Sequence, residues 1–171
     1  MIVFSTSAFA KKVEKMPVER DGLYYEHFSP NLANGQYEVY SSTGHLYERG
    51  TFKDGKLDGL YEVYKDNGQP QVKVTYKDGK LNRLTETYHE NGQLRTRATT
   101  KDGKLNGLIE SYFDNGQLKS RGTYKDGGYD GLYEAYYANG QLAWRGTQKD
   151  GKQDGLIESY FDNGQLKSRG T

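Results

Sequence analysis

The segment Gly107–Thr123 reads GLIESYFDNGQLKSRGT, and the same letters return at Gly155–Thr171. A looser version, GLYEAYYANGQLAWRGT, lies between them at Gly131–Thr147. A short unit repeated at a fixed period indicates an architecture in which each copy completes its neighbours. Counting back in steps of 24 residues finds three more copies, which begin at Arg83, Gly59 and Gly35.

These copies predict the organisation of the chain. Six repeats occupy 35–58, 59–82, 83–106, 107–130, 131–154 and 155–171, and the last is truncated. Before them, 11–34 reads as an N-terminal capping hairpin followed by a lead-in loop, because Asp21 and Gly22 form a turn signal between two short strand-like runs. Because the last repeat stops in mid-unit, its second strand would leave an open sheet edge. Such an edge favours end-to-end self-association.

Residues 1–10, MIVFSTSAFA, are mildly apolar and stop at Lys11 and Lys12. Ala8, Phe9 and Ala10 give the small-x-small pattern of a signal-peptide cleavage site. One interpretation is the remnant of a signal peptide, which would make the protein exported, that is, periplasmic, cell-surface or secreted. The other interpretation is a tail that matches by chance on a cytoplasmic protein.

The composition limits the class of function. Lys and Arg number 24 and Asp and Glu 23, so the net charge is +1, unlike that of a nucleic-acid binder. The mean hydropathy is -0.99, yet 13% of residues are aromatic, including 16 Tyr. Disordered chains are poor in aromatics, so we expect an ordered fold with a thin Tyr-rich core. There is no Cys, which excludes disulfides and thiolate metal sites.

Each repeat contains two short runs rich in Tyr, Val and Thr, separated by Asn-Gly and Asp-Gly turn signals. Asn-Gly and Asp-Gly between strand-forming runs are the strongest short-range signals for a β-hairpin. No segment shows a helical apolar period. The expected fold is therefore all-β: an elongated repeat protein built as a single twisted antiparallel meander of consecutive β-hairpins. The predicted turn residues are Asn67 and Gly68, Asn91 and Gly92, Asn115 and Gly116, Asn139 and Gly140, and Asn163 and Gly164.

Two hydrophobic positions recur on the first strand of the repeats, and neighbouring copies could stack each of them into a structural ladder. The Tyr ladder comprises Tyr40, Tyr64, Tyr88, Tyr112, Tyr136 and Tyr160. The Leu ladder comprises Leu60, Leu84, Leu108, Leu132 and Leu156. Some second strands also contain a Gly, such as Gly50 and Gly122, which a cross-strand aromatic could cover.

A Glu also recurs on the first strand and an Arg or Lys on the second. A two-residue Asn-Gly loop would place each Glu opposite its Arg or Lys, whereas a three-residue loop would place Tyr112 opposite Leu118. The sequence leaves this register open. The charges predict a cross-strand ion pair, and the alternative is a charged stripe for a partner.

From Tyr112 to Gly127 the chain reads YFDNGQLKSRGTYKDG, and this core resembles the bacterial variant MORN repeat. The resemblance covers 18–171. The family includes proteins described as YwqK-type antitoxins. It implies a sheet of consecutive hairpins and a role in binding rather than catalysis. Arg83 in place of the leading Gly, Pro70, and Ala98-Thr99-Thr100 in place of Gly-Thr-Tyr depart from the pattern, so the second and third copies are expected to be irregular.

Nothing in the sequence indicates catalysis, a cofactor or a metal. The three His residues, His27, His45 and His89, share no ligand spacing. Six equivalent Glu residues do not suit general acid–base chemistry, which needs two groups in unlike environments. We therefore expect no enzyme, no cofactor, no metal and no nucleic-acid partner.

The favoured function is a scaffold for protein–protein interaction, because Tyr, Trp and Arg dominate interface hot spots. Glycan or cell-wall binding, a lipid-headgroup surface and an antitoxin that binds a cognate toxin remain alternatives. If the strand continues past the ladder Tyr, the next residue points to the opposite face. The candidate binding surface comprises Phe113, Tyr137, Trp144, Phe161, Arg121, Arg145 and Arg169.

Overall fold

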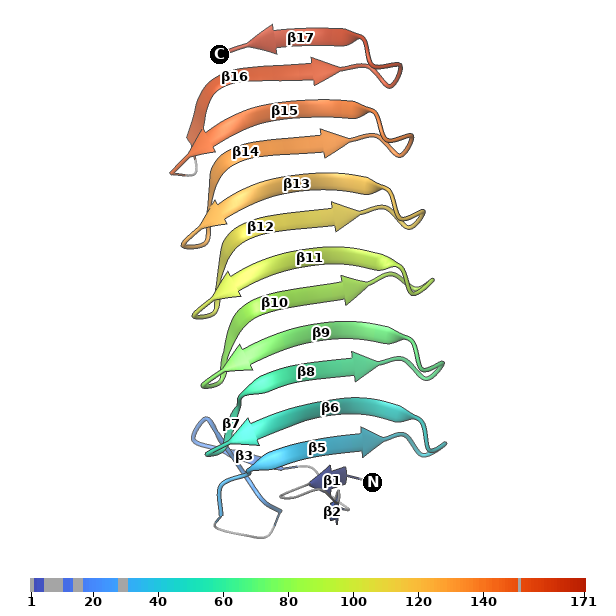
Figure 1. The fold of residues 1–171 in the computed structure, drawn as a ribbon, viewed down its shortest axis with the longest axis vertical. Coiled ribbons are helices and arrows are strands. Elements are labelled where there is room, and N and C mark those ends of the chain that lie inside the picture. Colours follow the sequence, from blue (N-terminus) through green and yellow to red (C-terminus); the bar gives the residue numbers. More distant parts are fainter. Residues whose placement is uncertain (1, 5–10, 14–16, 28–30, 151) are drawn as a thin grey trace. The chain divides into compact units, whose positions relative to one another are not determined.

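The computed structural model describes residues 2–4, 11–13, 17–27, 31–150 and 152–171 (Figure 1). In these residues the backbone forms strands, turns and loops, without a helix. The chain divides into two units, Met1–Asn82 and Arg83–Thr171, and the boundary falls inside one strand. The predicted all-β class is confirmed. The Ala8–Ala10 pattern behind the export interpretation lies outside the described residues.

Unit 1 contains one antiparallel sheet in the order β9-β8-β6-β5-β1-β2, with β7 beside β6. β3 and β4 form a separate hairpin. The strands are β1 (Ile2–Phe4), β2 (Lys11–Val13), β3 (Val18–Arg20), β4 (Leu23–Tyr25), β5 (Gly35–Tyr40), β6 (Leu46–Lys53), β7 (Lys56–Leu57), β8 (Gly59–Tyr64), β9 (Pro70–Lys77) and the first three residues of β10 (Lys80–Tyr88).

Unit 2 is a meander in which each strand from β10 to β17 pairs antiparallel with the next. This confirms the predicted consecutive hairpins. Besides the rest of β10, its strands are β11 (Leu94–Lys101), β12 (Lys104–Tyr112), β13 (Leu118–Lys125), β14 (Gly128–Tyr136), β15 (Leu142–Lys149), β16 (Lys152–Tyr160) and β17 (Leu166–Gly170).

The two turn signals fold differently. At Asp102 and Gly103 both φ angles are positive, 51° and 82°, as a two-residue type I′ turn requires. At the Asn-Gly signal only the glycine is left-handed, with φ 82° at Gly116. The Gly116 N–H donates to the Phe113 carbonyl at 2.9 Å, and the Phe113 N–H donates to the Gln117 carbonyl at 2.8 Å. This loop therefore has three residues and ends on a left-handed glycine.

The loop length settles the register that the sequence left open. Glu110 lies opposite Arg121, as expected for a two-residue loop. Tyr112 nevertheless lies opposite Leu118, as expected for a three-residue loop. The register shifts by one residue between these pairs, so Lys119 is an extra residue in a β-bulge. Each alternative therefore holds for part of the hairpin, and the same shift recurs in the other hairpins.

The dry core of unit 1 lies on one side of its sheet. Ala33, Tyr37 and Phe52 are at most 4% exposed. The ring of Tyr24, from β4, packs on Phe52 with centroids 4.9 Å apart. The Tyr24 N–H also donates to the Gly55 carbonyl at 2.8 Å. The β3–β4 hairpin therefore covers this side of the sheet and is bonded to it.

Aromatic rings from neighbouring strands cover Gly50 and Gly122 of the second strands, as the sequence predicts. A Cβ atom added at Gly50 would lie 2.8 Å from a ring carbon of Tyr37. The corresponding distance from Gly122 to the Tyr133 ring is 2.9 Å. The absence of a side chain at these positions allows the rings to lie against the backbone.

Candidate binding surfaces

Charged side chains form a ladder along one side of unit 2. Arg145 lies opposite both Glu134 of its own hairpin and Glu158 of the next. Glu158 is only 1% exposed and is ion-paired with the Arg145 Nε and, at 2.5 Å, with an Arg169 Nη. The Arg121 Nε lies 2.5 Å from a Glu134 carboxylate oxygen. Arg121 and Arg145 are therefore paired with the Glu of the next hairpin and link consecutive hairpins, whereas Arg169 is paired with Glu158 of its own hairpin, as predicted.

These contacts change the acidity of the glutamates. Hydrogen bonds from Arg145 and then Arg169 lower the pKa of Glu158 to about 2. In unit 1, Glu62 is 2% exposed between Arg49 and Lys73. Burial acts to raise the pKa of Glu62, but the hydrogen bond from Arg49 and its charge leave the pKa below the ordinary value. Both glutamates are therefore held as buried carboxylates.

The Tyr ladder contributes to the same network. The hydroxyl of Tyr112 donates to Glu110, two residues earlier on the same strand, at 3.0 Å. Tyr136 and Tyr160 make the equivalent bond at 3.0 Å, and Tyr88 makes it at 2.8 Å. Because residues i and i+2 share a face of a strand, the ladder Tyr, the Glu and the Arg lie on one side of unit 2. The Tyr ladder thus has a structural role there.

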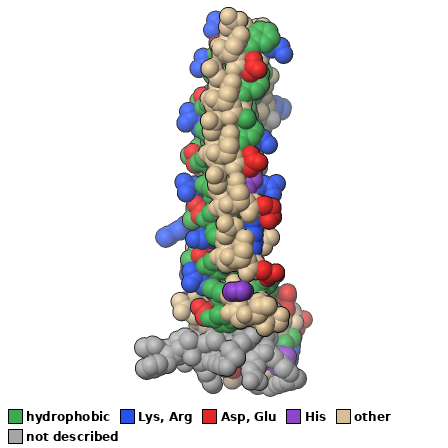
Figure 2. Space-filling view, turned by 90° about the vertical axis from the view of Figure 1, so that its right-hand side faces the viewer, with side chains coloured by type: hydrophobic (Ala, Val, Ile, Leu, Met, Phe, Trp, Pro, Cys, Tyr) green, Lys and Arg blue, Asp and Glu red, His purple; other side chains and the backbone are tan. Residues whose placement is uncertain are grey.

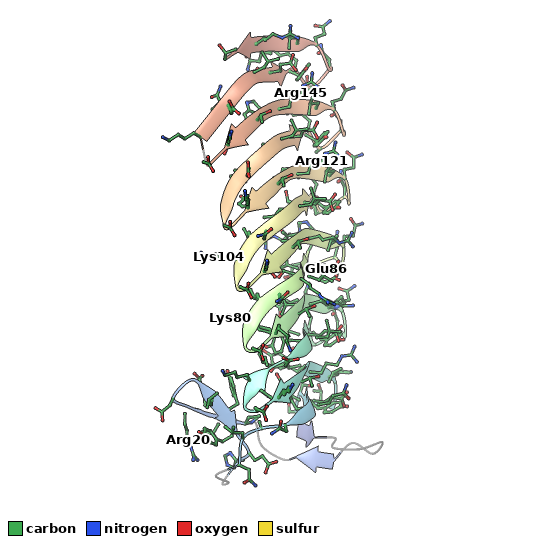
Figure 3. The ribbon with its side chains drawn as sticks, turned by 60° about the vertical axis from the view of Figure 1, so that its left-hand side comes forward. Arg20, Lys80, Glu86, Lys104, Arg121 and Arg145 are labelled. Atoms are coloured by element: carbon green, nitrogen blue, oxygen red, sulfur yellow. The ribbon has the colours of Figure 1, made fainter. Side chains whose placement is uncertain are left out.

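The Leu ladder of unit 2 lies on this side too, but it is not a core. Leu84, Leu108, Leu132 and Leu156 are 36–48% exposed. The Arg side chains beside them are 46–60% exposed, while their carboxylate partners are largely buried. Figure 3 shows Glu86, Arg121 and Arg145 projecting from successive hairpins, away from Lys104 at an Asp-Gly turn. We call this surface the Leu–Arg face; it comprises Leu84, Leu108, Leu132, Leu156, Arg97, Arg121, Arg145 and Arg169.

The opposite side of unit 2 carries a cluster of aromatic rings. The Tyr124 and Tyr129 centroids lie 4.0 Å apart, those of Tyr129 and Tyr133 5.4 Å, and those of Tyr133 and Trp144 5.3 Å. The four side chains come from β13, β14 and β15 and are half-buried. Burial, followed by the hydrogen bond with Tyr129, raises the pKa of Tyr124.

The residues around this cluster are uncharged. Within the described part of β11–β17, the positions that alternate with the Arg and Glu ladder hold Thr, Ala, Ser, Gly, Tyr, Trp, Leu, Ile and Gln. Charged side chains reach this side only at its margin, where Lys119 and Lys167 lie 5.6 Å from the Phe113 and Phe161 ring centroids. We call this side the uncharged face; it comprises Ser111, Ser120, Gly122, Tyr124, Tyr129, Tyr133, Ala135, Trp144, Gly146, Gln148, Gln153, Ile157, Ser159 and Ser168.

The Asn-Gly turns form a third surface, which Figure 2 shows as a column of backbone and polar side chains with acidic, basic and hydrophobic side chains beside it. In this column Asn139 acts twice. Its Oδ1 accepts the Gln141 N–H at 3.0 Å, and its Nδ2 donates to the Asp162 carbonyl of the next turn at 2.8 Å. Asn115 makes the equivalent bonds, the second one to Ala138 at 3.2 Å. The turns are therefore linked to one another.

The predicted binding residues do not form one surface. Arg121, Arg145 and Arg169 lie on the Leu–Arg face, whereas Trp144 lies on the uncharged face. The interpretation that the residue after the ladder Tyr continues the strand is wrong, because each strand ends at that Tyr and the following residue directly flanks the three-residue loop. Phe113, Tyr137 and Phe161 therefore belong to the turn column, where the Tyr137 hydroxyl donates to the Tyr160 carbonyl at 2.9 Å.

Unit 1 also has a hollow of about 320 Å³ beside its covered core, lined by Tyr24, Tyr37, Tyr61, Tyr76 and Glu48 among others. The Tyr37 hydroxyl donates to the buried carboxylate of Glu48 at 2.6 Å. Among the described residues, no group of three or more His, Asp or Glu side chains could hold a metal ion. The described part of the chain also has no helix with the length and apolarity to cross a membrane.

Repeated hairpins with structural ladders and no catalytic constellation among the described residues define a β-repeat scaffold. The MORN repeat variant model matches 33–54, 57–78, 84–102, 105–126, 129–143 and 153–171. The chain belongs to this family, which is generally non-catalytic. No match was found among curated proteins.

Two solved structures show partial likeness. One is a point mutant of S. aureus TarM in complex with fondaparinux, alpha-GlcNAc-glycerol and UDP, with 12% identity and a TM-score of 0.37 over 68% of this chain and 20% of TarM. The other is TarM, with 12% identity and a TM-score of 0.35 over 56% of this chain and 18% of TarM. The chain thus spans about a fifth of the length of these proteins.

Proposed function

We propose that this protein is a non-catalytic scaffold whose Leu–Arg face binds an extended protein segment rich in apolar and acidic side chains. The observation that carries the proposal is the row of four leucines, 36–48% exposed, beside a row of exposed arginines. Exposed apolar side chains gathered on one face mark interaction sites in soluble proteins, and here Thr99, Thr123 and Thr147 lie opposite the leucines.

Burial of the glutamates determines which charge a partner meets. Glu158 and Glu134 lie beneath the arginines and are at most 8% exposed, whereas Arg145 and Arg121 are nearly half exposed. The equal numbers of Glu and Arg cancel in net charge, but the outer layer is basic. An acidic segment is therefore complementary to this face.

The spacing favours an extended ligand. Equivalent residues of consecutive repeats are two strands apart, or about 9.6 Å at the usual interstrand distance. A partner with apolar residues at that interval could contact several leucines at once, so that weak single contacts add along its length.

Site-specific photocrosslinking in the native cell tests the proposal. A photoreactive amino acid in place of Leu132 should capture a partner containing an acidic segment. The double substitution Leu108→Glu and Leu156→Glu should abolish capture by adding charge repulsion. Trp144→Ser, on the opposite face, is the matched control and should leave capture intact. Equal capture with and without the two glutamates would contradict the proposal.

A further inference from the structure

We infer that the uncharged face of unit 2 is a second binding site, for a neutral polysaccharide. This site lies on the side of the sheet opposite the Leu–Arg face and does not depend on the function proposed for that face. The inference follows from the packing of the aromatic rings, the polar groups around them and the absence of charge among the described residues of this face.

The aromatic cluster provides apolar surface on a sheet over which the described residues place no second layer. A Cβ atom added at Gly146 would lie 3.1 Å from two indole carbons of Trp144, so the indole lies over the glycine backbone. Tyr129 and Tyr133 cover Gly122 in the same way. The electron-rich faces of aromatic rings attract the C–H groups of sugar rings.

Hydroxyl and amide groups flank the cluster. Ser111 and Ser120 hydrogen-bond across β12 and β13 at 2.6 Å, and Ser159 and Ser168 do so across β16 and β17 at 2.6 Å. On the other flank, Gln148 faces Gln153 across β15 and β16. Each of these groups can both donate and accept, as sugar hydroxyls do. Neutral hydrogen-bonding groups around an aromatic centre therefore match an uncharged sugar chain.

The lack of charge selects among ligands. Recognition of phosphate, sulfate or carboxylate groups uses Arg or Lys, and in the described strands of unit 2 these residues occupy the Leu–Arg face and the margins. Conversely, a cationic segment would lose solvation without gaining a carboxylate partner from the described residues of this face. A neutral polymer avoids both costs.

Unit 1 provides an internal contrast. There the corresponding side is occupied by Tyr24 and Ala33 from the N-terminal segment, and Glu48 places a carboxylate in the remaining hollow. The aromatic rings of unit 1 are thus used for packing and lie beside a charge. We therefore expect sugar binding to be confined to unit 2.

The single tryptophan makes the site directly observable, because Trp144 is the only Trp of the chain. We would titrate the full chain with cellohexaose, chitohexaose and mannohexaose, and with oligogalacturonate as an anionic control. At least one neutral oligosaccharide should change the Trp144 fluorescence saturably, and oligogalacturonate should not. Tyr129→Ala should weaken binding about tenfold, equivalent to about 1.4 kcal/mol.

Three further variants keep the result interpretable. The double substitution Gln148→Ala and Gln153→Ala alters polar groups on the flank of the cluster and should weaken binding even if Tyr129→Ala destabilises the fold. Arg121→Ala on the Leu–Arg face should leave oligosaccharide affinity unchanged. Trp144→Phe should remove the fluorescence signal while calorimetry still detects binding.

Two results would overturn the inference. One is the absence of any fluorescence change or heat with all three neutral oligosaccharides at millimolar concentration. The other is concentration-dependent dimerisation, seen by sedimentation equilibrium and abolished by Trp144→Ser, because the face would then pack against a second copy of the chain. Neither result would affect the photocrosslinking test of the Leu–Arg face.

Discussion

The two units contain the same repeat but differ in what covers the aromatic side of the sheet. In unit 1 the β3–β4 hairpin and Ala33 cover this side, and Tyr37 and Phe52 become almost fully buried. In unit 2 the described residues provide no such cover, and the aromatic cluster stays half-buried. The difference indicates that one layer of hairpins does not exclude water by itself, and that a dry core needs a segment from outside the repeat.

The largest effect should come from opening the covered side. Phe52→Ala removes a ring packed against Tyr24 and Tyr37 and should cost about 3–4 kcal/mol of unfolding free energy. Tyr129→Ala in the uncovered cluster should cost much less. Urea denaturation with hydrogen exchange of peptides from each unit measures both. Equal losses would show that unit 2 also has a dry core, and the contrast would fail.

Two glycine-to-alanine substitutions sharpen the comparison, because each adds one carbon atom to the backbone of a second strand. Gly50→Ala forces a contact with the Tyr37 ring and should destabilise unit 1 by about 1–3 kcal/mol. Gly170 occupies the equivalent position in β17 and has no neighbouring atom within 4 Å of an added Cβ, so Gly170→Ala is the matched control. Thermal unfolding of the two variants should separate them. A harmless Gly50→Ala would mean that the Tyr37 ring moves freely.

Arg83 tests a strained backbone position at the first residue of unit 2. Its φ is 79°, whereas the equivalent positions, such as Gly107 and Gly131, are glycines with φ of 112° and 119°. Arg83→Gly should stabilise unit 2 by about 1 kcal/mol because a side chain is unfavourable in this conformation. Gly131→Arg should have the opposite sign. An unchanged melting temperature in both variants would argue against strain.

Turn-to-turn bonding should matter in unit 2, where no described segment covers the hairpins and holds them together. Asn139→Asp preserves the acceptor within the turn but removes the donor to the Asp162 carbonyl, at a cost of about 1 kcal/mol. In Asn163 the described structure shows only the acceptor bond, to the Gln165 N–H. Asn163→Asp should therefore be nearly neutral by differential scanning calorimetry. Equal losses of stability in the two variants would mean that the added charge, and not the lost hydrogen bond, causes the effect.

A further effect should emerge only in acid. The pKa of Glu158 is about 2, below its ordinary value of 4.5, so the folded state favours the carboxylate. The resulting stabilisation is complete above the unfolded pKa and is lost as the pH falls through the folded pKa, between about pH 5 and 2. Thermal unfolding of the wild type should show this loss, and Glu158→Gln should flatten it. An identical pH dependence in both proteins would exclude Glu158 as the cause.

The hairpins could be predicted from the sequence because their causes are local. Asn-Gly and Asp-Gly turn signals and a period of 24 residues determine strand, turn and strand order without tertiary information. The register required more, because the bulge at Lys119 reconciles two loop lengths that the sequence presents as alternatives.

The binding surfaces were harder to predict for the same physical reason. Phe113, Tyr137 and Phe161 were assigned to a strand face on the premise that the strand includes them, but each strand ends one residue earlier. The cluster of Tyr124, Tyr129 and Tyr133 was missed because its members come from three positions of the repeat and meet only across paired strands. In the sequence, uncharged residues directly precede and follow Arg121 and Arg145. This alternation of charged and uncharged residues was the signal that could have found the uncharged face.

The ladder of shared glutamates and arginines has a consequence for how such a chain changes length. Every 24-residue unit supplies one acid and one base to the network, so a whole unit can be gained or lost with each remaining acid still flanked by bases. Recombination between the identical segments Gly107–Thr123 and Gly155–Thr171, which begin two periods apart, would add or remove two whole units in frame. A change of a single residue would instead turn the guanidinium groups toward the aromatic side. Electrostatics thus allows evolution in whole repeats and opposes anything shorter.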